Sequence, residues 1–530
     1  MRDHTSPTHP RTEINPSGIG LATVIAAMVV ACALLLYLQQ RYWSWTADDS
    51  YITFRYAENL ANGQGVVFNP GERVEGYTNF LWMLLLSGLF RIGADTVIAA
   101  KLLGAACALL TLLASAGVAR HLSGGRWTAA AVAVPTLLAS SPSFAAWSVA
   151  GLETALFTLL LTVAVWLFSV EQDAPSRFPW SGVLFALAGM TRPEGVLVFV
   201  LLFGLVVARS MQVPLDRTRM LRRGLLFLVA FSALALPYMA WRVSYFGYLL
   251  PNTFYVKGGR GVTQILAGIL YVSAGIRKHG GILLHLVAFL PAIWGPYRRR
   301  ASGFALAIAG WQAYNVYKGH DVLELFRFFV PILPILYAMS IVALVQLYEA
   351  LPDRLPRVTL ATAALALFVA GTVVTNMVMA YASQDPRPQL REYQLQIRID
   401  DDEFIVYAKR LIAIAPPGSS IAVIDAGVVP YLTKWYTIDR WGLCDVHIAH
   451  SRGRGPLGEK FDEAYVLAKK PTFIQTKVTT KMERQGNPGW AGDTELFANS
   501  TFLQEYVRVP EPELDGFFVR TDVLRLLAAK

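Results

Sequence analysis

Charge and cysteine are both scarce in this sequence. Only 16% of its 530 residues are charged and 54% are hydrophobic, whereas a soluble domain carries about 25% charged residues. The cysteines Cys32, Cys107 and Cys444 form no spaced pair, so neither a disulfide framework nor a zinc site is expected. A GxGxxG pattern occurs at 453–458 ("GRGPLG"), but no glycine-rich phosphate loop directly follows the strand-like run "AVIDAG", and no P-loop motif occurs. These features together favour a membrane protein without a nucleotide site.

The positive net charge of +10 does not indicate a nucleic-acid partner. Much of the excess lies in short basic clusters between apolar runs, such as "ARSMQVPLDRTRMLRR" and "YRRR". Loops of this kind mark the cytoplasmic side of a membrane protein. The lipid bilayer is therefore an expected partner, and nucleic acid is not.

Long apolar runs predict a mostly α-helical, polytopic membrane protein with about eleven transmembrane helices, because one span takes about 20 apolar residues. The longer runs lie near 19–39, 97–117, 154–170, 194–208, 223–241, 281–297, 302–317, 327–349 and 357–381, and two shorter ones lie at 127–141 and 179–191. The first run is followed by "RYWSW", which is typical of an aromatic belt. We expect a signal anchor there, because the apolar core of a cleaved signal peptide is shorter.

The basic loops set the orientation and the domains. With Arg209–Arg223 and Arg298–Arg300 in the cytoplasm, the parity of the spans requires that the apolar run at 79–91 does not cross. As a helix this run would be about 20 Å long, too short for the hydrocarbon core, so we expect it to lie in the outer interface. The predicted domains are a cytoplasmic tail (1–18), a transmembrane domain (19–384) with a large outer loop (40–95), and a soluble extracytoplasmic domain (385–530).

The C-terminal domain is predicted to be a small α/β domain. "SSIAVIDAG", "WYTIDRWGL" and "PTFIQT" predict short strands, and "EKFDEAYVLAKK" predicts a helix. The domain either shapes a groove for an acceptor or forms a structural cap over the membrane part.

Two acids, Asp48 and Asp49, stand side by side in "TADDSYITFRYAENLANGQG", at the outer edge of the first span. This stretch predicts a helix from about Ser50 to Ala61, with Asp49 or Ser50 as the N-cap and Asn62-Gly63 as the left-handed stop. A cap explains one carboxylate and leaves Asp48 for another role. Asp48 is a candidate general base; alternatively, the pair is a candidate site for Mg²⁺ or Mn²⁺.

Further polar and aromatic residues fall on the same outer face, Lys318 among them. Such crowding at one membrane surface indicates a cavity for a charged or sugar-like substrate. The alternatives are a solvated loop for each residue singly, a helix start at Glu153, and an ion pair between Arg192 and Glu194. The candidate substrate-binding residues are Arg55, Glu75, Tyr77, Glu153, Glu194, Asn252, Tyr255, His320 and Asp321.

The block "DDSYITFRYAENLANGQGVVFNPGERVEGYTNFLW" resembles the first outer loop of polytopic glycosyltransferases of the GT-C fold, in particular the mycobacterial terminal β-arabinofuranosyltransferases. The likeness continues through "SVAGLETALF", "TRPEG", "LPNTFYVK", "FRFFVPILP" and "VIDAGVVPYLTKWYTIDRWGLCDVHIAH". It implies an enzyme of the bacterial plasma membrane. Such an enzyme moves a sugar, by analogy arabinofuranose, from a polyprenyl-phosphate donor to a glycan, lipid or protein acceptor outside the cytoplasm.

The resemblance also implies roles for single residues. An acid of the first outer loop is catalytic in such proteins, which here means Asp48 or Asp49, and Asp48 is preferred because Asp49 has the competing role of a cap. The leaving phosphate needs cationic partners, for which Lys257, Arg192 and Arg327 are the candidates. Alternatively, Lys257 is an exposed loop lysine and Arg192 forms a local ion pair. For Arg327, the alternative is a side chain that reaches from a span end to the interface.

Two other functions compete with glycosyl transfer. A transporter or flippase of lipid-linked sugars would show internal repeats and polar residues at mid-membrane depth, whereas the polar residues here gather at the outer ends of the spans. A non-catalytic envelope assembly protein would leave Asp48 without a role beyond capping.

Overall fold

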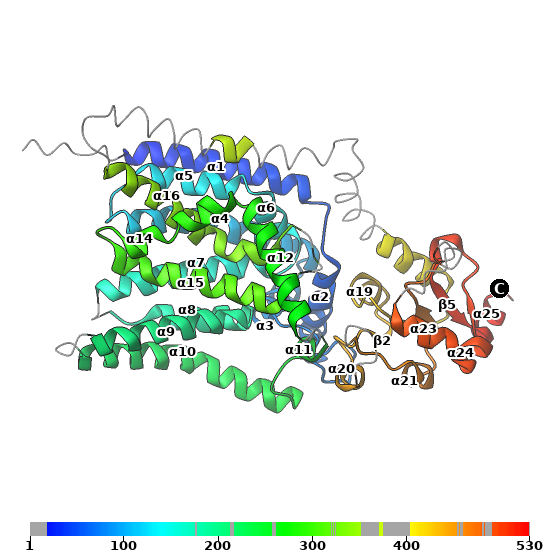
Figure 1. The fold of residues 1–530 in the computed structure, drawn as a ribbon. Coiled ribbons are helices and arrows are strands. Elements are labelled where there is room, and N and C mark those ends of the chain that lie inside the picture. Colours follow the sequence, from blue (N-terminus) through cyan, green and yellow to red (C-terminus); the bar gives the residue numbers. More distant parts are fainter. Residues whose placement is uncertain are drawn as a thin grey trace, which may run out of the picture.

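The computed structural model describes residues 19–174, 177–212, 217–256, 261–319, 321, 323, 325–350, 370–374, 403–452, 455, 459–479, 482 and 490–528. A bundle of long helices lies beside a smaller α/β domain (Figure 1). The short helices α2 (Asp48–Ala61), α3 (Phe80–Arg91) and α11 (Asn252–Val256) lie at the end of the bundle that faces this domain.

Most helices of the bundle follow the apolar runs of the sequence. They are α1 (Leu21–Tyr42), α4 (Thr96–Leu122), α5 (Ala129–Ala139), α6 (Pro142–Val149), α7 (Thr154–Asp173), α8 (Trp180–Thr191), α9 (Glu194–Gln212), α10 (Arg217–Phe246), α12 (Val262–Lys278), α13 (Gly281–Val287), α14 (Leu290–Ile293), α15 (Arg298–Lys318), η2 (Arg327–Ile332) and α16 (Leu333–Glu349). Large side chains such as Trp147 and Trp311 are fully buried among them.

Six helices within the described residues are long and apolar enough to cross a membrane, or up to eight if each bent pair counts as one span. The bent pairs are α5 with α6, at 61°, and α12 with the segment Gly281–Ile293, at 93°. A mostly helical, multi-pass membrane protein is thus confirmed, but the count of eleven spans is not. The predicted span at 357–381 lies largely outside the described residues.

Helix α2 begins at Asp48, two residues before the predicted start. Its N-cap is Ala47, which has no side-chain acceptor, so the predicted cap role of Asp49 or Ser50 is wrong. The Ser50 hydroxyl instead donates to the carbonyl oxygen of Ala150 at 2.9 Å. The predicted stop is confirmed, because Gly63 takes a left-handed φ of 78°.

Helix α3 follows the outer loop and packs on α2 and α4. Its 12 residues give a length of about 18 Å, which is shorter than the hydrocarbon core, as expected for a helix that does not cross. Trp82 and Met83 are buried, whereas Leu84 and Leu85 are exposed. The exposed pair gives α3 an apolar outer face suited to the membrane interface.

The C-terminal region contains a five-stranded sheet in the order β2-β1-β3-β5-β4. Strands β1 (Ser420–Val423), β2 (Tyr436–Asp439) and β3 (Phe473–Gln475) confirm the three predicted strands, and β1 pairs in parallel with β2 and β3. The antiparallel strands β4 (Tyr506–Arg508) and β5 (Phe517–Arg520) were not predicted. The helices of the domain are α19 (Val428–Thr433), α20 (Val446–His450), α21 (Glu463–Ala468), α23 (Ala491–Ala498), α24 (Ser500–Glu505), η4 (Pro512–Leu514) and α25 (Thr521–Ala528).

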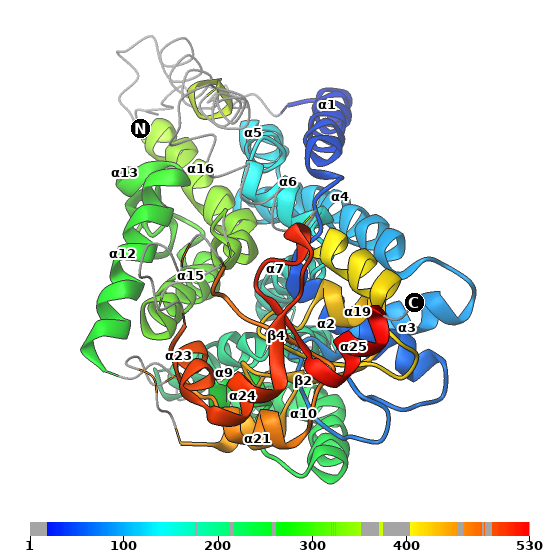
Figure 2. The same ribbon diagram turned by 90° about the vertical axis from the view of Figure 1, so that its right-hand side faces the viewer.

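The α/β domain and the outer helices share one hydrophobic core. Tyr51 and Phe54 of α2 belong to the same buried cluster as Val423 of β1, Val428 of α19 and Phe473 of β3. Figure 2 shows α19 next to α2 at this junction. The domain is therefore packed against the membrane part, because separating the two would expose this apolar surface to water.

Candidate functional site

The "TRPEG" stretch places a buried arginine between two helices. Helix α8 ends at Thr191, because Pro193 cannot continue a helix, and α9 begins at Glu194. Arg192 Nη1 donates to Glu153 Oε1 at 2.6 Å, and Arg192 Nη2 donates to Glu194 Oε1 at 2.9 Å. The predicted pairing of Arg192 with Glu194 is confirmed, and Glu153 completes it. Since two carboxylates already hold this guanidinium, its predicted role as a phosphate ligand is not supported by the geometry.

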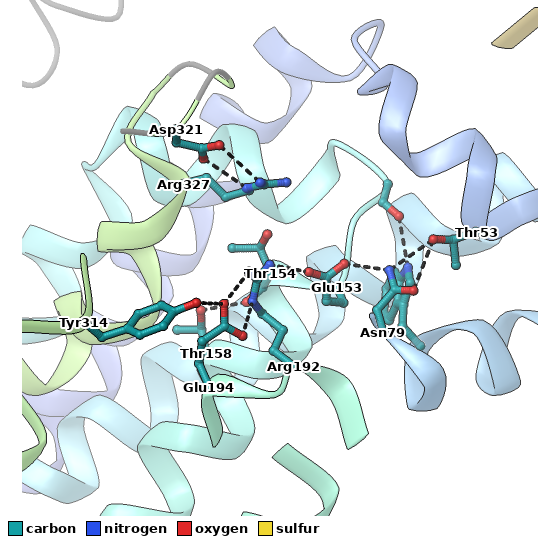
Figure 3. Close-up of polar contacts among 12 residues, drawn as sticks. Thr53, Asn79, Glu153, Thr154, Thr158, Arg192, Glu194, Tyr314, Asp321 and Arg327 are labelled. Atoms are coloured by element: carbon teal, nitrogen blue, oxygen red, sulfur yellow. Dashed lines mark hydrogen bonds and ion pairs between the residues drawn. The ribbon is translucent and has the colours of Figure 1, made fainter. Parts of the chain in front are cut away.

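Glu153 extends this ion pair toward the outer loop (Figure 3). Its Oε2 atom accepts a hydrogen bond from Asn79 Nδ2 at 2.7 Å, and the Asn79 amide is in turn hydrogen-bonded to Thr53 of α2. At the other end, the Tyr314 hydroxyl of α15 donates to Glu194 at 3.1 Å. A continuous chain of polar side chains thus joins α2 to α15 through the bundle.

Three cations meet at the aromatic ring of Phe328. Lys318 Nζ lies 2.8 Å, Arg192 Cζ 4.7 Å and Arg327 Cζ 5.0 Å from the centroid of this ring. Arg327 is paired with Asp321, with Nε and Oδ2 3.2 Å apart. An aromatic face attracts cations, but neighbouring like charges repel one another. Carboxylates already pair with Arg192 and Arg327, so Lys318 is the group of the three that an anion would meet.

Lys318 is the member of this cluster that lacks a hydrogen bond. Its Nζ atom is buried and has no hydrogen-bond partner among the described residues. An ammonium group carries three donors, and burying it without acceptors is costly. This group is therefore the one best prepared to receive an anionic ligand.

The backbone is strained next to the cluster. Leu325 and Phe326 have φ values of 55° and 50°, in the left-handed region that is uncommon for residues other than glycine. Such strain persists only where the surrounding structure imposes it, and it gathers at functional sites. Here it turns the chain directly before Arg327, the first residue of η2.

The acid pair lies at the junction with the α/β domain. Asp48 Oδ1 accepts a hydrogen bond from the backbone N–H of Val428 at 2.7 Å. Among the described residues, no hydrogen bond or ion pair to the Asp49 side chain is found. Both acids are half-buried. Asp48 and Asp49 thus differ in the hydrogen bond that Asp48 accepts from Val428. They do not differ in helix capping, because the N-cap is Ala47.

Arg55 joins the two domains and does not face a cavity. Its Nη1 donates to the carbonyl oxygen of Pro430 and its Nη2 to that of Trp435, each at 2.7 Å, while its Nε donates to Phe68 at 2.8 Å. Burial lowers the pKa of the guanidinium to about 10. Since its donors are already engaged, we reinterpret this predicted substrate-binding residue as a docking residue.

Glu75 and Tyr77 are also parts of the protein core. Glu75 Oε2 lies 2.6 Å from Nη2 of Arg242, and both side chains are buried. Burial raises the pKa of the Glu75 carboxyl, and the Arg242 guanidinium opposes this shift. Tyr77 is buried beside Tyr56 and Phe246. These contacts describe structural residues, and the predicted substrate roles have no support in them.

Asn252 and Tyr255 come from α11, at the outer end of the bundle. Asn252 is buried, and its Nδ2 atom has no hydrogen-bond partner in the described part of the chain. Tyr255 is half-buried, and its ring lies 4.5 Å from that of His450 in α20. The substrate-binding roles of Asn252 and Tyr255 stay predictions. Lys257 and His320 lie outside the described residues.

The acid pair does not supply a complete metal site by itself. In the described ranges, no group of three His, Cys, Asp or Glu side chains is close enough to hold a metal ion. One oxygen of Asp48 already accepts the Val428 N–H. Mg²⁺ and Mn²⁺ prefer about six oxygen ligands, so these residues alone do not fit the predicted ion.

Sequence reasoning did not assign roles to Lys318 or Val428. Lys318 ends a span, where a lysine usually reaches toward the interface, and only the fold brings it to Phe328 and Arg327. Val428 acts through its backbone N–H, and because every residue except proline has this group, the residue type does not reveal the contact. The glycine before it, Gly427, is the one available signal, because a Cβ there would overlap Asp48.

Comparisons with known proteins agree with this architecture. The structure matches that of ArnT from Cupriavidus metallidurans bound to undecaprenyl phosphate with a TM-score of 0.57 and 14% identity, over 94% of this chain and 98% of that one. It matches the archaeal oligosaccharyltransferase AglB from Archaeoglobus fulgidus, in complex with an inhibitory peptide and a dolichol-phosphate, with a TM-score of 0.56 and 12% identity, over 94% and 74%. The chain therefore has the fold of the GT-C membrane glycosyltransferases.

Two proteins related in sequence carry a more specific name than the structural neighbours do. The terminal beta-(1->2)-arabinofuranosyltransferase of Mycobacterium tuberculosis is 29% identical over 258 residues, which are 46% of this chain and 40% of the relative. The protein of the same name from Corynebacterium glutamicum is 26% identical over 277 residues, 48% of this chain and 39% of the relative. The matches thus span about two fifths of these relatives, and they confirm the resemblance seen in the sequence motifs. A family model described as a domain of unknown function (DUF8728) matches residues 388–518.

Proposed function

We propose that this protein is a membrane glycosyltransferase that moves a sugar from a polyprenyl-phosphate donor to an acceptor outside the cytoplasm. The observation that carries the proposal is the buried Lys318 amine beside Arg327 and Phe328. Lys318 lies on α15, the same helix as Tyr314, from which the polar chain reaches Thr53 of α2. ArnT and AglB, the structural neighbours, were solved with undecaprenyl phosphate and dolichol-phosphate. We therefore assign a donor of this chemical class.

The phosphate of the donor is proposed to lie against Lys318 and Arg327. Arg327 offers a planar fork and Lys318 a point charge. As the sugar leaves, negative charge grows on the phosphate, and nearby fixed cations stabilise it. Lys257 remains a candidate for the same role from the predicted set.

Asp48 is proposed as the general base. Its carboxylate accepts the proton of the acceptor hydroxyl, while the hydroxyl oxygen bonds to the anomeric carbon of the sugar. The bond between that carbon and the phosphate oxygen breaks, and its electron pair leaves with polyprenyl phosphate.

The relatives support a sugar, and the basic loops of the sequence support a location. Arabinofuranose is the proposed sugar, because the curated relatives carry this activity in their name. The proposed acceptor is a glycan, lipid or protein of the cell envelope. The proposed location of the protein is the plasma membrane of a bacterium, with the α/β domain and the acid pair on the outer side. Asn252 and Tyr255 are proposed to contact the substrate at the rim.

The test is release of free polyprenyl phosphate by the purified protein. A panel of polyprenyl-phosphate sugars, including arabinofuranose, is offered together with an envelope glycan acceptor. We expect one donor to be consumed, with the sugar recovered on the acceptor. A flippase in vesicles would instead move the intact donor across the bilayer, and that outcome without any release of polyprenyl phosphate would refute the proposal.

A further inference from the structure

We propose that the α/β domain positions the catalytic acid, with the backbone N–H of Val428 orienting the Asp48 carboxylate. This inference rests on the proposed function, because it takes Asp48 as the base. Val428 is thus a positioning residue that acts through Asp48.

The contact comes from a short connection in the sheet. Strand β1 ends at Val423, and α19 begins at Val428, whose N–H lies 2.7 Å from Asp48 Oδ1. Gly427 leaves no room for a larger residue, since a Cβ there would overlap both the main-chain oxygen and the carboxylate of Asp48. The glycine therefore lets the α/β domain approach the first residue of α2 closely.

Two further residues of α2 fix this approach. Arg55 lies seven residues after Asp48, close to two helical turns, and therefore shares its face of the helix. Glu58 lies three residues beyond Arg55 and also reaches the α19 region. Arg55 donates to the carbonyl oxygens that follow Val428, as described above. Glu58 accepts hydrogen bonds from the Tyr431 hydroxyl and from Lys434 Nζ. The position of Val428 relative to Asp48 is thus set by contacts along the whole helix.

This arrangement matters because a general base works only in a defined geometry. A shift of about 1 Å at a reacting group can cost about 100-fold in rate. Asp48 stands at the first position of α2. A hydrogen bond from a backbone N–H to a carboxylate is charge-assisted and directional, and here it comes from the start of α19 in the α/β domain.

The experiment replaces the N–H by the ring carbon of proline, which cannot donate and which displaces the Asp48 carboxylate from its present position. Val428→Pro deletes this donor at the first position of α19, where proline is well tolerated, and Val428→Ala, which keeps the N–H, is the reference. Both lose the buried valine side chain. We expect kcat for donor turnover to be about tenfold lower in the proline variant than in the alanine variant, as one charge-assisted hydrogen bond is worth, with an unchanged KM for the donor.

Gly427→Ala provides a second, independent variant, in which the added Cβ displaces the carboxylate. It is measured alone and in the Asp48→Asn background. A fall in kcat that disappears in that background supports action through Asp48, and an equal fall in both refutes it. Equal kcat for Val428→Pro and Val428→Ala would overturn the inference while leaving the proposed function intact. A wild-type protein that turns over no donor would instead refute the proposed function itself.

Discussion

Lys318 and Arg327 lie against one ring, with Lys318 Nζ 2.8 Å and Arg327 Cζ 5.0 Å from the centroid of Phe328. Arg327 has Asp321 as its counter-ion, whereas the Lys318 ammonium has no hydrogen-bond partner in the residues described. The two side chains thus differ in how many of their donors are already engaged. A donor phosphate would supply hydrogen-bond acceptors to Lys318.

Lys318→Met should weaken donor binding without unfolding the protein. Methionine fills similar space but carries no charge, so we expect the KM for the donor to rise about tenfold or more, as loss of a hydrogen bond to a charged group implies. Lys318→Arg keeps the charge and should retain most of the affinity. Tyr317→Phe, at the exposed neighbouring position, is the control. An unchanged donor KM and kcat in Lys318→Met would remove this residue from the phosphate site.

Asp48→Asn should lower turnover strongly, to a small residual rate, while preserving domain docking. The amide oxygen of asparagine can still accept the Val428 N–H, but the side chain can no longer take up a proton. Loss of a general base costs about 10² to 10⁴ in rate. Asp49→Asn should be milder, and both variants should melt near the wild-type temperature. Near-normal turnover in Asp48→Asn together with an inactive Asp49→Asn would show that the roles are reversed.

The α/β domain should be more stable at mildly acidic than at neutral pH. Burial raises the pKa of the Asp439 carboxyl from 3.8 to about 7, although the N–H groups of Cys444, Gly442 and Trp441 oppose the shift. An acid with a raised pKa in the folded state stabilises the fold below its unfolded pKa, and this contribution is lost as pH rises through about 7. Melting temperatures in detergent should therefore fall over this range. Asp439→Asn should flatten the dependence, and an equally steep dependence in that variant would contradict the assignment.

Topology is testable with fusions to a reporter that is active only outside the cytoplasm. A fusion at the C-terminus should be active, and one inserted after Gln212 should be inactive, because the basic loop after α9 marks the cytoplasmic side. The reverse pattern would place Asp48 on the wrong face for a donor exposed outside the cell.

The sequence predicted the features that depend on local pattern. Strands β1 to β3 were recognisable from short β-branched runs between turns, and the pairing of Arg192 with Glu194 followed from their spacing around Pro193. Strands β4 and β5 are no shorter than β1 to β3, but each adjoins a helix with no turn between them: β4 directly follows α24, and β5 runs directly into α25. No turn residue marked these boundaries in the sequence. The cap at Asp49 was wrong because acids are common at both the N-cap and the first turn.

The site itself depends on contacts that no local pattern contains. Asp48 and Val428 are 380 residues apart, and their contact uses a backbone group. Arg55 was predicted to bind substrate because it is one of the polar residues that gather at the outer face. Its actual acceptors, such as the Pro430 carbonyl oxygen, are set by the docking of a separate domain. Similarly, the candidate role of Lys318 depends on its contact with the ring of Phe328, ten residues further along the chain.

The docking of α2 also decides what the sheet can bind. In an open α/β sheet, ligands usually enter the crevice at the carboxyl ends of parallel strands, where the chain order reverses. Strand β1 lies between β2 and β3 in such an arrangement, and the segment that follows it is covered by Asp48 and the rest of α2. The protein's own helix thus fills the place that a diffusing nucleotide would take in a related sheet. Substitutions in the α/β domain are therefore expected to covary with substitutions in the first outer loop. Grafting the α/β domain onto another membrane helix bundle would require α2 to be transferred with the domain.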